Sequence, residues 1–225
     1  MAKVKKTANV IETAQDGGIP IPEEIMPALI ESFIMDSGSD NVAVFGGRFE
    51  GGIHCQQVPD ELAGFIKFML DAGSAIQSYL EISISAGGTA CVIAKFLNPE
   101  NIVVIDNNRH WAAAKRAAIL NGIGYLEIVG NSRSPETIAR AGSDHDIVFI
   151  DGERTYEGVM ADAKNFIPLV RPGGFVAIHD STLEARGITQ AVNELKEDPG
   201  LEFVTEFLST KRAPLGIALF RKVVK

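Results

Sequence analysis

Short apolar runs alternate along this chain with segments whose apolar residues recur every three or four positions. The first run begins at residue 78, the others occupy residues 102–106, 126–129, 146–151 and 175–180, and helical periodicity fills the intervals between them. Right-handed crossovers between such strands predict a mainly parallel sheet with helices on both faces. Two closing strands, 201–208 and 215–223, are joined by a link too short for a helix, so they should form an antiparallel hairpin at one edge. The pattern therefore predicts a seven-stranded α/β fold.

The N-terminal part of the chain has a different character. Residues 1–20 are polar and predict a mobile arm, and residues 36–52 predict a loop with a short strand at 42–45. Between them, a helix begins at Pro22 and keeps its apolar side chains on one face, as a lid or a dimerisation element would. We therefore divide the chain into an N-terminal arm with a helical lid or dimerisation segment, residues 1–52, and an α/β domain, residues 53–225.

Three local features of the α/β domain follow from turn and cap chemistry. Asp60 is the expected N-cap of a helix that stops at Gly73. Asn107 or Asn108 is expected to cap a helix that carries Trp111 on its apolar face. Residues 171–174, Arg-Pro-Gly-Gly, predict a turn before the fifth strand.

The stretch from Ser78 to Asp106 has the outline of a βαβ unit that holds a nucleotide-like ligand. A strand ends in small residues, Gly87 and Gly88 open a helix, and the next strand closes on Asp106. Glycines leave backbone N–H groups accessible at a strand-to-helix turn, and a strand-end carboxylate can accept both hydroxyl protons of a ribose. The alternatives are a tight turn without a ligand for the two glycines and a helix cap for Asp106.

Composition narrows the classes of partner. Lys and Arg total 21 against 29 Asp and Glu, a formal net charge of −8, so a nucleic acid is not expected as the principal partner. Cys55 and Cys91 are far apart and form no CxxC pair, so neither a disulfide framework nor a thiolate zinc site is indicated. The basic N-terminus is followed by polar residues rather than an apolar core, and no apolar run reaches membrane-spanning length. We expect a cytoplasmic protein that does not enter a membrane.

Three stretches together resemble a known family of enzymes. They are residues 80–89, LEISISAGGT; residues 148–159, VFIDGERTYEGV; and residues 169–180, which open with LVRPGG and close with His179 and Asp180. From about Gln57 to the C-terminus, the chain is similar to class I S-adenosylmethionine-dependent methyltransferases of the small-molecule branch, which includes cephalosporin hydroxylase-like and macrocin O-methyltransferase-like proteins. Catechol O-methyltransferase is a more distant relative. The resemblance implies a Rossmann-like fold and methyl transfer to an oxygen, less readily a nitrogen, of a small molecule.

The same resemblance implies roles for individual residues. It places the ribose of S-adenosylmethionine, the cofactor, at Asp106 and Asn107, at the next strand end, and the adenine at Asn131 and Ser132, after the third strand. The methionine part would lie among loop and strand residues, namely Glu81, Ser83, Gly87, Gly88 and Thr89. Asp151 would face the reacting centre. In metal-dependent relatives, carboxylates at the positions of Asp151 and Asp180 bind magnesium, which lowers the pKa of the substrate hydroxyl. Strand-end carboxylates are also common as solvated groups or helix caps.

Two positions depart from the family pattern. The family usually has glycine where this chain has Ser83, whose side chain narrows the approach to the cofactor. It often has histidine where this chain has Arg154, and arginine stays protonated, so it can orient an anionic group but is a poor base. The available bases are then His179, Asp151 and Glu153, although His179 is also compatible with a hydrogen-bonded histidine at the rim of the sheet.

The sequence is compatible with three functions. The leading one is a methyltransferase that acts on a small molecule, with an N-terminal helical segment that could form a homo-oligomer. The second is a catalytically silent protein or accessory subunit that binds S-adenosylmethionine or its demethylated product, a hypothesis that Ser83 and Arg154 motivate. The third is an NAD(P)-dependent oxidoreductase, which needs a G-x-G-x-x-G fingerprint that is absent because Ser83 and Ser85 stand where glycines would be required.

Overall fold

A computed structural model describes residues 26–36, 53–73 and 75–224 of the 225-residue chain. The arm predicted at 1–20, the short strand predicted at 42–45 and the first residues of the helix predicted from Pro22 lie outside these residues. That helix is present as α2, Met26–Asp36. No helix in the described part of the chain is long and apolar enough to span a lipid bilayer.

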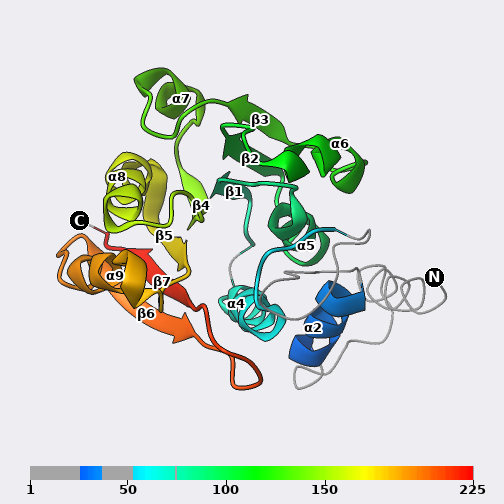
Figure 1. Cartoon of the computed structure of the whole chain (residues 1–225). Helices are drawn as coiled ribbons and strands as arrows, with labels where there is room; N and C mark the ends of the chain where they lie inside the picture. The colour runs from blue at the N-terminus through cyan, green and yellow to red at the C-terminus, as the bar shows by residue number, and fades with distance from the viewer. Residues whose placement is uncertain (1–25, 37–52, 74, 225) are drawn as a thin grey trace.

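Within the described residues, one sheet has the strand order β3-β2-β1-β4-β5-β7-β6 (Figure 1). The first five strands of this order are parallel, and β7 lies antiparallel between β5 and β6. The seven-stranded, mostly parallel sheet with a C-terminal hairpin is thus confirmed. The strand bounds are β1 Ser78–Ile82, β2 Asn101–Asp106, β3 Leu126–Val129, β4 His145–Ile150, β5 Val170–His179, β6 Leu201–Phe207 and β7 Ile217–Lys222.

Helices cover both faces of the sheet because successive strand residues point to opposite sides. Tyr79 and Phe149 pack with α2, α4 (Pro59–Asp71) and α5 (Gly88–Phe96) in one apolar layer. Leu80 and Ile150, their neighbours in sequence, pack with α8 (Tyr156–Phe166) and α9 (Ile188–Lys196) in the other. A shorter helix, α7 (Pro135–Arg140), lies beside β3 (Figure 1).

Two predicted caps are wrong. Val58, not Asp60, precedes α4, and Pro59 takes the first helical position, where its missing N–H costs nothing. The helix predicted after Asn107 or Asn108 is instead a 3₁₀ turn, η1 (Trp111–Lys115), followed by a single α-turn, α6 (Arg116–Ile119). The ring of His110 caps it by accepting a hydrogen bond from Ala112, which leaves Trp111 on the surface with 59% of its area exposed.

The turn predicted at residues 171–174 is a bulge inside β5. His145 pairs with Val170 and Ile147 with Phe175, so the intervening residues of β5 leave the ladder and the strand then resumes. The other connections of the second half are two 3₁₀ turns, η2 (Ile167–Leu169) before β5 and η3 (Glu184–Arg186) before α9.

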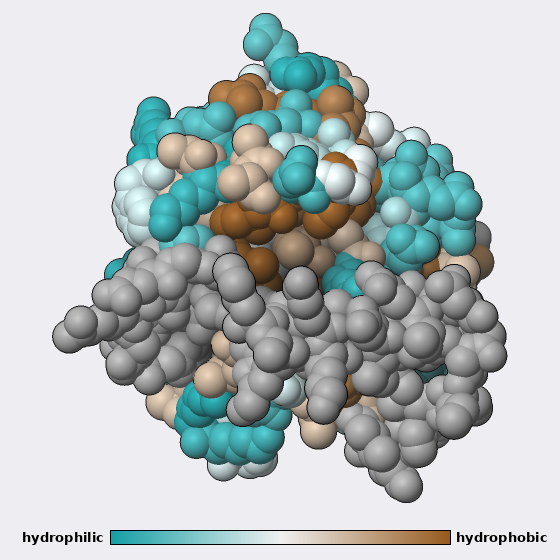
Figure 2. All heavy atoms as spheres, turned by 90° about the vertical axis from the view of Figure 1, so that its right-hand side faces the viewer, coloured by the Kyte–Doolittle hydropathy of each residue, from teal (hydrophilic) through white to brown (hydrophobic). Residues whose placement is uncertain are grey.

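The face that carries α2, α5 and α6 shows a band of apolar side chains between polar ones (Figure 2). Beside α5 lies an apolar groove of about 380 Å³, lined among others by Phe33, Ala94 and Ile102. This groove lies away from the carboxyl ends of β1 and β4. At those ends the connections turn in opposite directions, to β2 on one side and to β5 on the other, which is where open α/β sheets bind ligands.

Candidate active site

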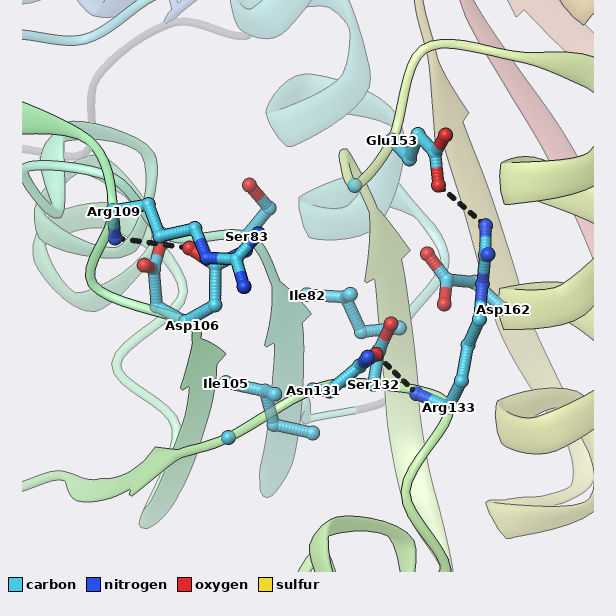
Figure 3. A pocket seen from close by; sticks show the side chains of 13 residues that line it. Ile82, Ser83, Ile105, Asp106, Arg109, Asn131, Ser132, Arg133, Glu153 and Asp162 are labelled. Atoms are coloured by element: carbon cyan, nitrogen blue, oxygen red, sulfur yellow. Dashed lines mark hydrogen bonds and ion pairs between the residues drawn. The ribbon is translucent and has the colours of Figure 1, made fainter.

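Two cavities lie at the carboxyl ends of the parallel strands. The larger is a cleft of about 490 Å³ above β1, β2 and β4 (Figure 3). The smaller, of about 190 Å³, extends from the end of β1 toward the loop after β4. Ser83 and Gly152 line both, so the two spaces meet where β1 and β4 end.

Most of the residues expected at the site line one of these spaces. The larger cleft brings together Ser83, Asp106, Asn107, Asn131, Ser132 and Glu153. The smaller cavity brings together Glu81, Ser83, Gly88, Thr89, Asp151 and Arg154. Gly87, His179 and Asp180 line neither, although the last two contact residues that do.

The loop between β1 and α5 bends sharply in the left-handed region. Ser83 has φ 69°, Ser85 has φ 51° and Gly87 has φ 93°. A residue with a side chain pays roughly 1–2 kcal/mol for this conformation, which explains why the related enzymes favour glycine at the position of Ser83. The backbone N–H of Ser83 donates to the carbonyl of Ile105 at 2.8 Å, which fixes the bend against β2.

The two glycines of this loop face the protein's own chain. A Cβ at Gly88 would lie 2.4 Å from Cα of Cys55 and 2.5 Å from its backbone N, and one at Gly87 would meet the side chain of Leu120 at 3.0 Å. Gly88 is therefore needed for the approach of the segment before α4, a reason that differs from the ligand contact predicted from the sequence. Gly88 and Thr89 also line the smaller cavity, so the same turn packs against the segment before α4 and faces the space open to a ligand.

Asp106 ends β2 with its carboxylate in the larger cleft. One oxygen, Oδ2, accepts from the backbone N–H of Ser85 at 2.8 Å, and the other, Oδ1, accepts from that of Asn108 at 2.6 Å. The guanidinium of Arg116 lies 3.4 Å from Oδ2. An ionised carboxylate has about four acceptor positions, so these contacts orient the group and leave capacity for two ligand hydroxyls.

The buried side chain of Arg116 was not predicted from the sequence. Its Nε donates to the carbonyl of Ser85 at 3.0 Å, and its Nη1 donates to Asn108 at 2.8 Å and to Glu127 at 2.5 Å. Arg116 thus ties together the loop after β1, the loop after β2 and strand β3, and only 2% of its area is exposed. It stabilises the loops that hold Asp106 in place.

The opposite end of the larger cleft is built by the loops after β3 and β4 (Figure 3). Asn131 uses its side-chain oxygen to accept from the backbone of Arg133 at 2.9 Å, which closes a tight turn. Arg133 pairs with Glu153 across the mouth of the cleft at 2.5 Å. Glu153 is therefore directed toward this end of the cleft, and it is not among the residues of the smaller cavity, where Asp151 lies.

Asp151, His179 and Asp180 form a buried polar group behind the smaller cavity. Nδ1 of His179 lies 3.0 Å from Oδ1 of Asp151, and Nε2 of Gln57 donates to Oδ2 of Asp151 at 3.0 Å. Complete burial opposes protonation of the His179 ring, but the carboxylates of Asp151 and Asp180 outweigh burial and raise its pKa. In this group only Asp151 reaches the cavity surface, and the ring of His179 contacts that carboxylate from behind.

The guanidinium of Arg154 lies between the two strand-end carboxylates. Its Nε donates to Asp180, and its Nη2 lies 3.6 Å from Oδ1 of Asp151. Ligand atoms of Asp151, His179 and Asp180 lie within 4.8 Å of one another, as a metal site would require. Arg154 already supplies the positive charge at this place, so with its side chain here the donor set does not fit a divalent ion.

Glu81 lies in the wall of the smaller cavity with only 1% of its area exposed. Burial raises its pKa to about 8, and the hydrogen bond that the Tyr79 hydroxyl donates at 2.9 Å opposes this shift. Near neutral pH the apo protein therefore holds this carboxyl largely protonated, and an ammonium group beside it would favour the ionised form.

Comparison with known proteins defines the class of the fold. Residues 80–181 match the family model described as a methyltransferase domain. The fold is similar to that of S-adenosylmethionine-dependent methyltransferases of known structure, as the sequence resemblance implied. No curated protein sequence matches the chain at a significant level.

Solved structures that match the chain have low sequence identity and therefore show the fold alone. Cofactor-bound Rv0187 from MTB has 18% identity, a TM-score of 0.62 and 92% coverage of both chains. The O-methyltransferase TomG from Streptomyces achromogenes, in complex with S-adenosylmethionine, has 16% identity, a TM-score of 0.60 and coverage of 91% of this chain and 100% of its own. An O-methyltransferase from Bacillus cereus, in complex with S-adenosylhomocysteine, has 12% identity, a TM-score of 0.58 and coverage of 97% and 99%.

Proposed function

We propose that the protein transfers the methyl group of S-adenosylmethionine to an oxygen, less readily a nitrogen, of a small molecule. The observation that carries this proposal is the pair of adjoining cavities with Asp106 in one and Asp151 in the other. The larger cleft would hold adenosine, with the ribose hydroxyls on Asp106. The smaller cavity would hold the methionine end and the methyl group, with the ammonium group near Glu81.

The chemistry needs two reactants held in line and a proton acceptor. The acceptor oxygen attacks the methyl carbon, the carbon–sulfur bond breaks, and its electron pair neutralises the sulfonium. The hydroxyl proton passes to Asp151, which is the carboxylate that His179 and Gln57 orient and which reaches the cavity. Arg154 lies 3.6 Å from Asp151 and can stabilise developing negative charge on the acceptor oxygen.

The reaction is tested directly with S-adenosylmethionine that carries a labelled methyl group. The purified chain is incubated with this cofactor and a panel of catechols, phenols, sugar hydroxyls and amines, and methylated products are detected by mass together with S-adenosylhomocysteine. We expect label in at least one hydroxylated acceptor and a marked loss with Asp151→Asn. Transfer to amines alone would correct the acceptor class, and failure to bind the cofactor at all would refute the proposal.

The position of Arg154 favours one alternative function. Because its guanidinium compensates both strand-end carboxylates, the protein could bind the cofactor without activating a nucleophile. This alternative predicts cofactor binding with no turnover over the whole panel. Arg154→His distinguishes the two functions. Turnover by this variant, with none by the wild type, would indicate a protein that binds the cofactor but lacks a base.

A further inference from the structure

The guanidinium group of Arg154 has N–H donors that the protein does not use. Arg154 lines the smaller cavity, and 39% of its side chain is exposed. Its Nε donates to Asp180 and its Nη2 lies 3.6 Å from Asp151, whereas its Nη1 forms no hydrogen bond or ion pair with any residue that the structure describes. A guanidinium presents five N–H donors in a planar fork that suits a carboxylate. Arg154 can therefore bind an anionic group in the cavity while it keeps its two present partners.

Two titratable side chains in the wall of the same cavity do not serve as bases near neutral pH. Burial raises the pKa of Glu81 to about 8, so this carboxyl is largely protonated. Nε2 of His54 lies 2.8 Å from Nζ of Lys115, and burial together with this ammonium group lowers the pKa of His54 to about 4. The cavity is therefore better supplied with N–H donors than with bases. An acceptor group that is already ionised needs no base.

An aromatic surface with a cation beside it adjoins the cavity. Trp111 is 59% exposed, and its ring centre lies 6.2 Å from that of His54 and 5.6 Å from that of His110. Both histidines line the smaller cavity. Nζ of Lys115 lies 5.3 Å from the centre of the Trp111 ring. A flat aromatic body that carries a negative charge would find complementary groups here.

We propose that the protein has a further activity, the formation of a methyl ester on an aromatic carboxylic acid whose carboxylate Arg154 binds. This inference rests on the proposed function, because the methyl group comes from S-adenosylmethionine in the same site. One carboxylate oxygen attacks the methyl carbon, the carbon–sulfur bond breaks, and its electron pair stays on sulfur. The negative acid and the positive sulfonium become a neutral ester and S-adenosylhomocysteine, so no proton is transferred. Arg154 contributes by orienting the carboxylate.

Binding of the acid is measured by isothermal titration of the full chain saturated with S-adenosylhomocysteine. The probes are 3-hydroxybenzoate and 4-hydroxybenzoate, each beside its uncharged amide. We expect the wild type to bind each acid at least about tenfold more tightly than its amide, as hydrogen bonds between charged groups would give. Arg154→Met should bring the two affinities within about threefold of each other. Arg140→Met, which removes an exposed arginine from α7, should keep the preference of the wild type.

The product shows which oxygen has reacted. With S-adenosylmethionine that carries a labelled methyl group, mild alkali releases labelled methanol from a methyl ester but not from a methyl ether. We expect alkali-labile label from the wild type, a result that does not depend on the folding of any variant. Absence of that label, or equal affinities of the wild type for acid and amide, would overturn the inference and leave the cofactor site standing. A folded wild type that does not bind S-adenosylhomocysteine would overturn the proposed function itself.

Discussion

Arg154 donates a hydrogen bond from its Nε to the buried carboxylate of Asp180, from one strand-end loop to the next. The same guanidinium lies 3.6 Å from Asp151. A fixed cation therefore stands where related enzymes with a metal would place a divalent ion.

Removal of Arg154 should create a site for a divalent ion. Arg154→Ala leaves Asp151, His179 and Asp180 without a counter-charge, at a cost of roughly 1–2 kcal/mol, because more than a third of the arginine side chain is exposed. We expect millimolar Mn²⁺ or Mg²⁺ to raise the melting temperature of Arg154→Ala by several degrees. The wild type and Arg133→Ala, which loses only an exposed pair, should not respond. Equal stabilisation of the wild type by these ions would contradict the account.

A methyl group at Gly88 should disturb the packing of the start of α5 against the segment before α4. The added Cβ of Gly88→Ala would lie 2.4 Å from the backbone of Cys55, so the segment has to shift, and overpacking of this kind costs about 1–3 kcal/mol. Gly124→Ala is the matched control, since nothing lies within 4 Å of its added Cβ, and it should stay within about 0.5 kcal/mol of the wild type. Urea denaturation measures both. Equal free energies of unfolding for the two variants would refute the close contact.

Glu81 should make the apo protein less stable as pH rises. Its pKa is about 8 when folded against 4.5 for the free group, so between these values the folded chain holds a proton that the unfolded chain has lost. Stability therefore falls with pH in this window, by up to about 1.4 kcal/mol per pH unit. Glu81→Gln should remove that slope, so its advantage over the wild type should grow from pH 5 to pH 8 and then level off.

Thermal or urea denaturation at several pH values checks this prediction. Glu136→Gln, which changes an exposed carboxylate on α7, should follow the wild type at every pH. A constant difference between Glu81→Gln and the wild type would show that the carboxyl is not held protonated. Glu81→Gln should also weaken cofactor binding, since it removes the charge that the ammonium group would meet.

The fold could be predicted from the sequence because its signals are local. Alternating apolar runs and helical stripes predicted a mainly parallel sheet, and the short link at residues 209–214 required an antiparallel hairpin. The same logic placed Asp106 and Asp151 at one edge, because the carboxyl ends of parallel strands lie together. The errors fall where tertiary contacts override local chemistry, as at the bulge in β5 and at the 3₁₀ turn capped by His110.

The rest of the site depends on contacts between distant segments. Gln57 reaches Asp151 across 94 residues, and Cys55 lies against Gly88, and neither contact leaves a trace in the local pattern. Asp162, a buried residue of α8 that lines the larger cleft, did leave a signal, because it falls on the same helical stripe as Val159 and Phe166, three positions after one and four before the other.

The central claim is that the cleft at Asp106 holds the nucleoside of S-adenosylmethionine. Titration of the folded chain with S-adenosylhomocysteine tests it most directly, with Asp106→Asn beside Glu136→Gln. We predict one site per chain for the wild type and for Glu136→Gln, and an affinity about 10- to 100-fold lower for Asp106→Asn, as expected when hydrogen bonds to a charged acceptor are lost. No binding to the folded wild type at millimolar ligand, or equal affinity in Asp106→Asn, would contradict the account.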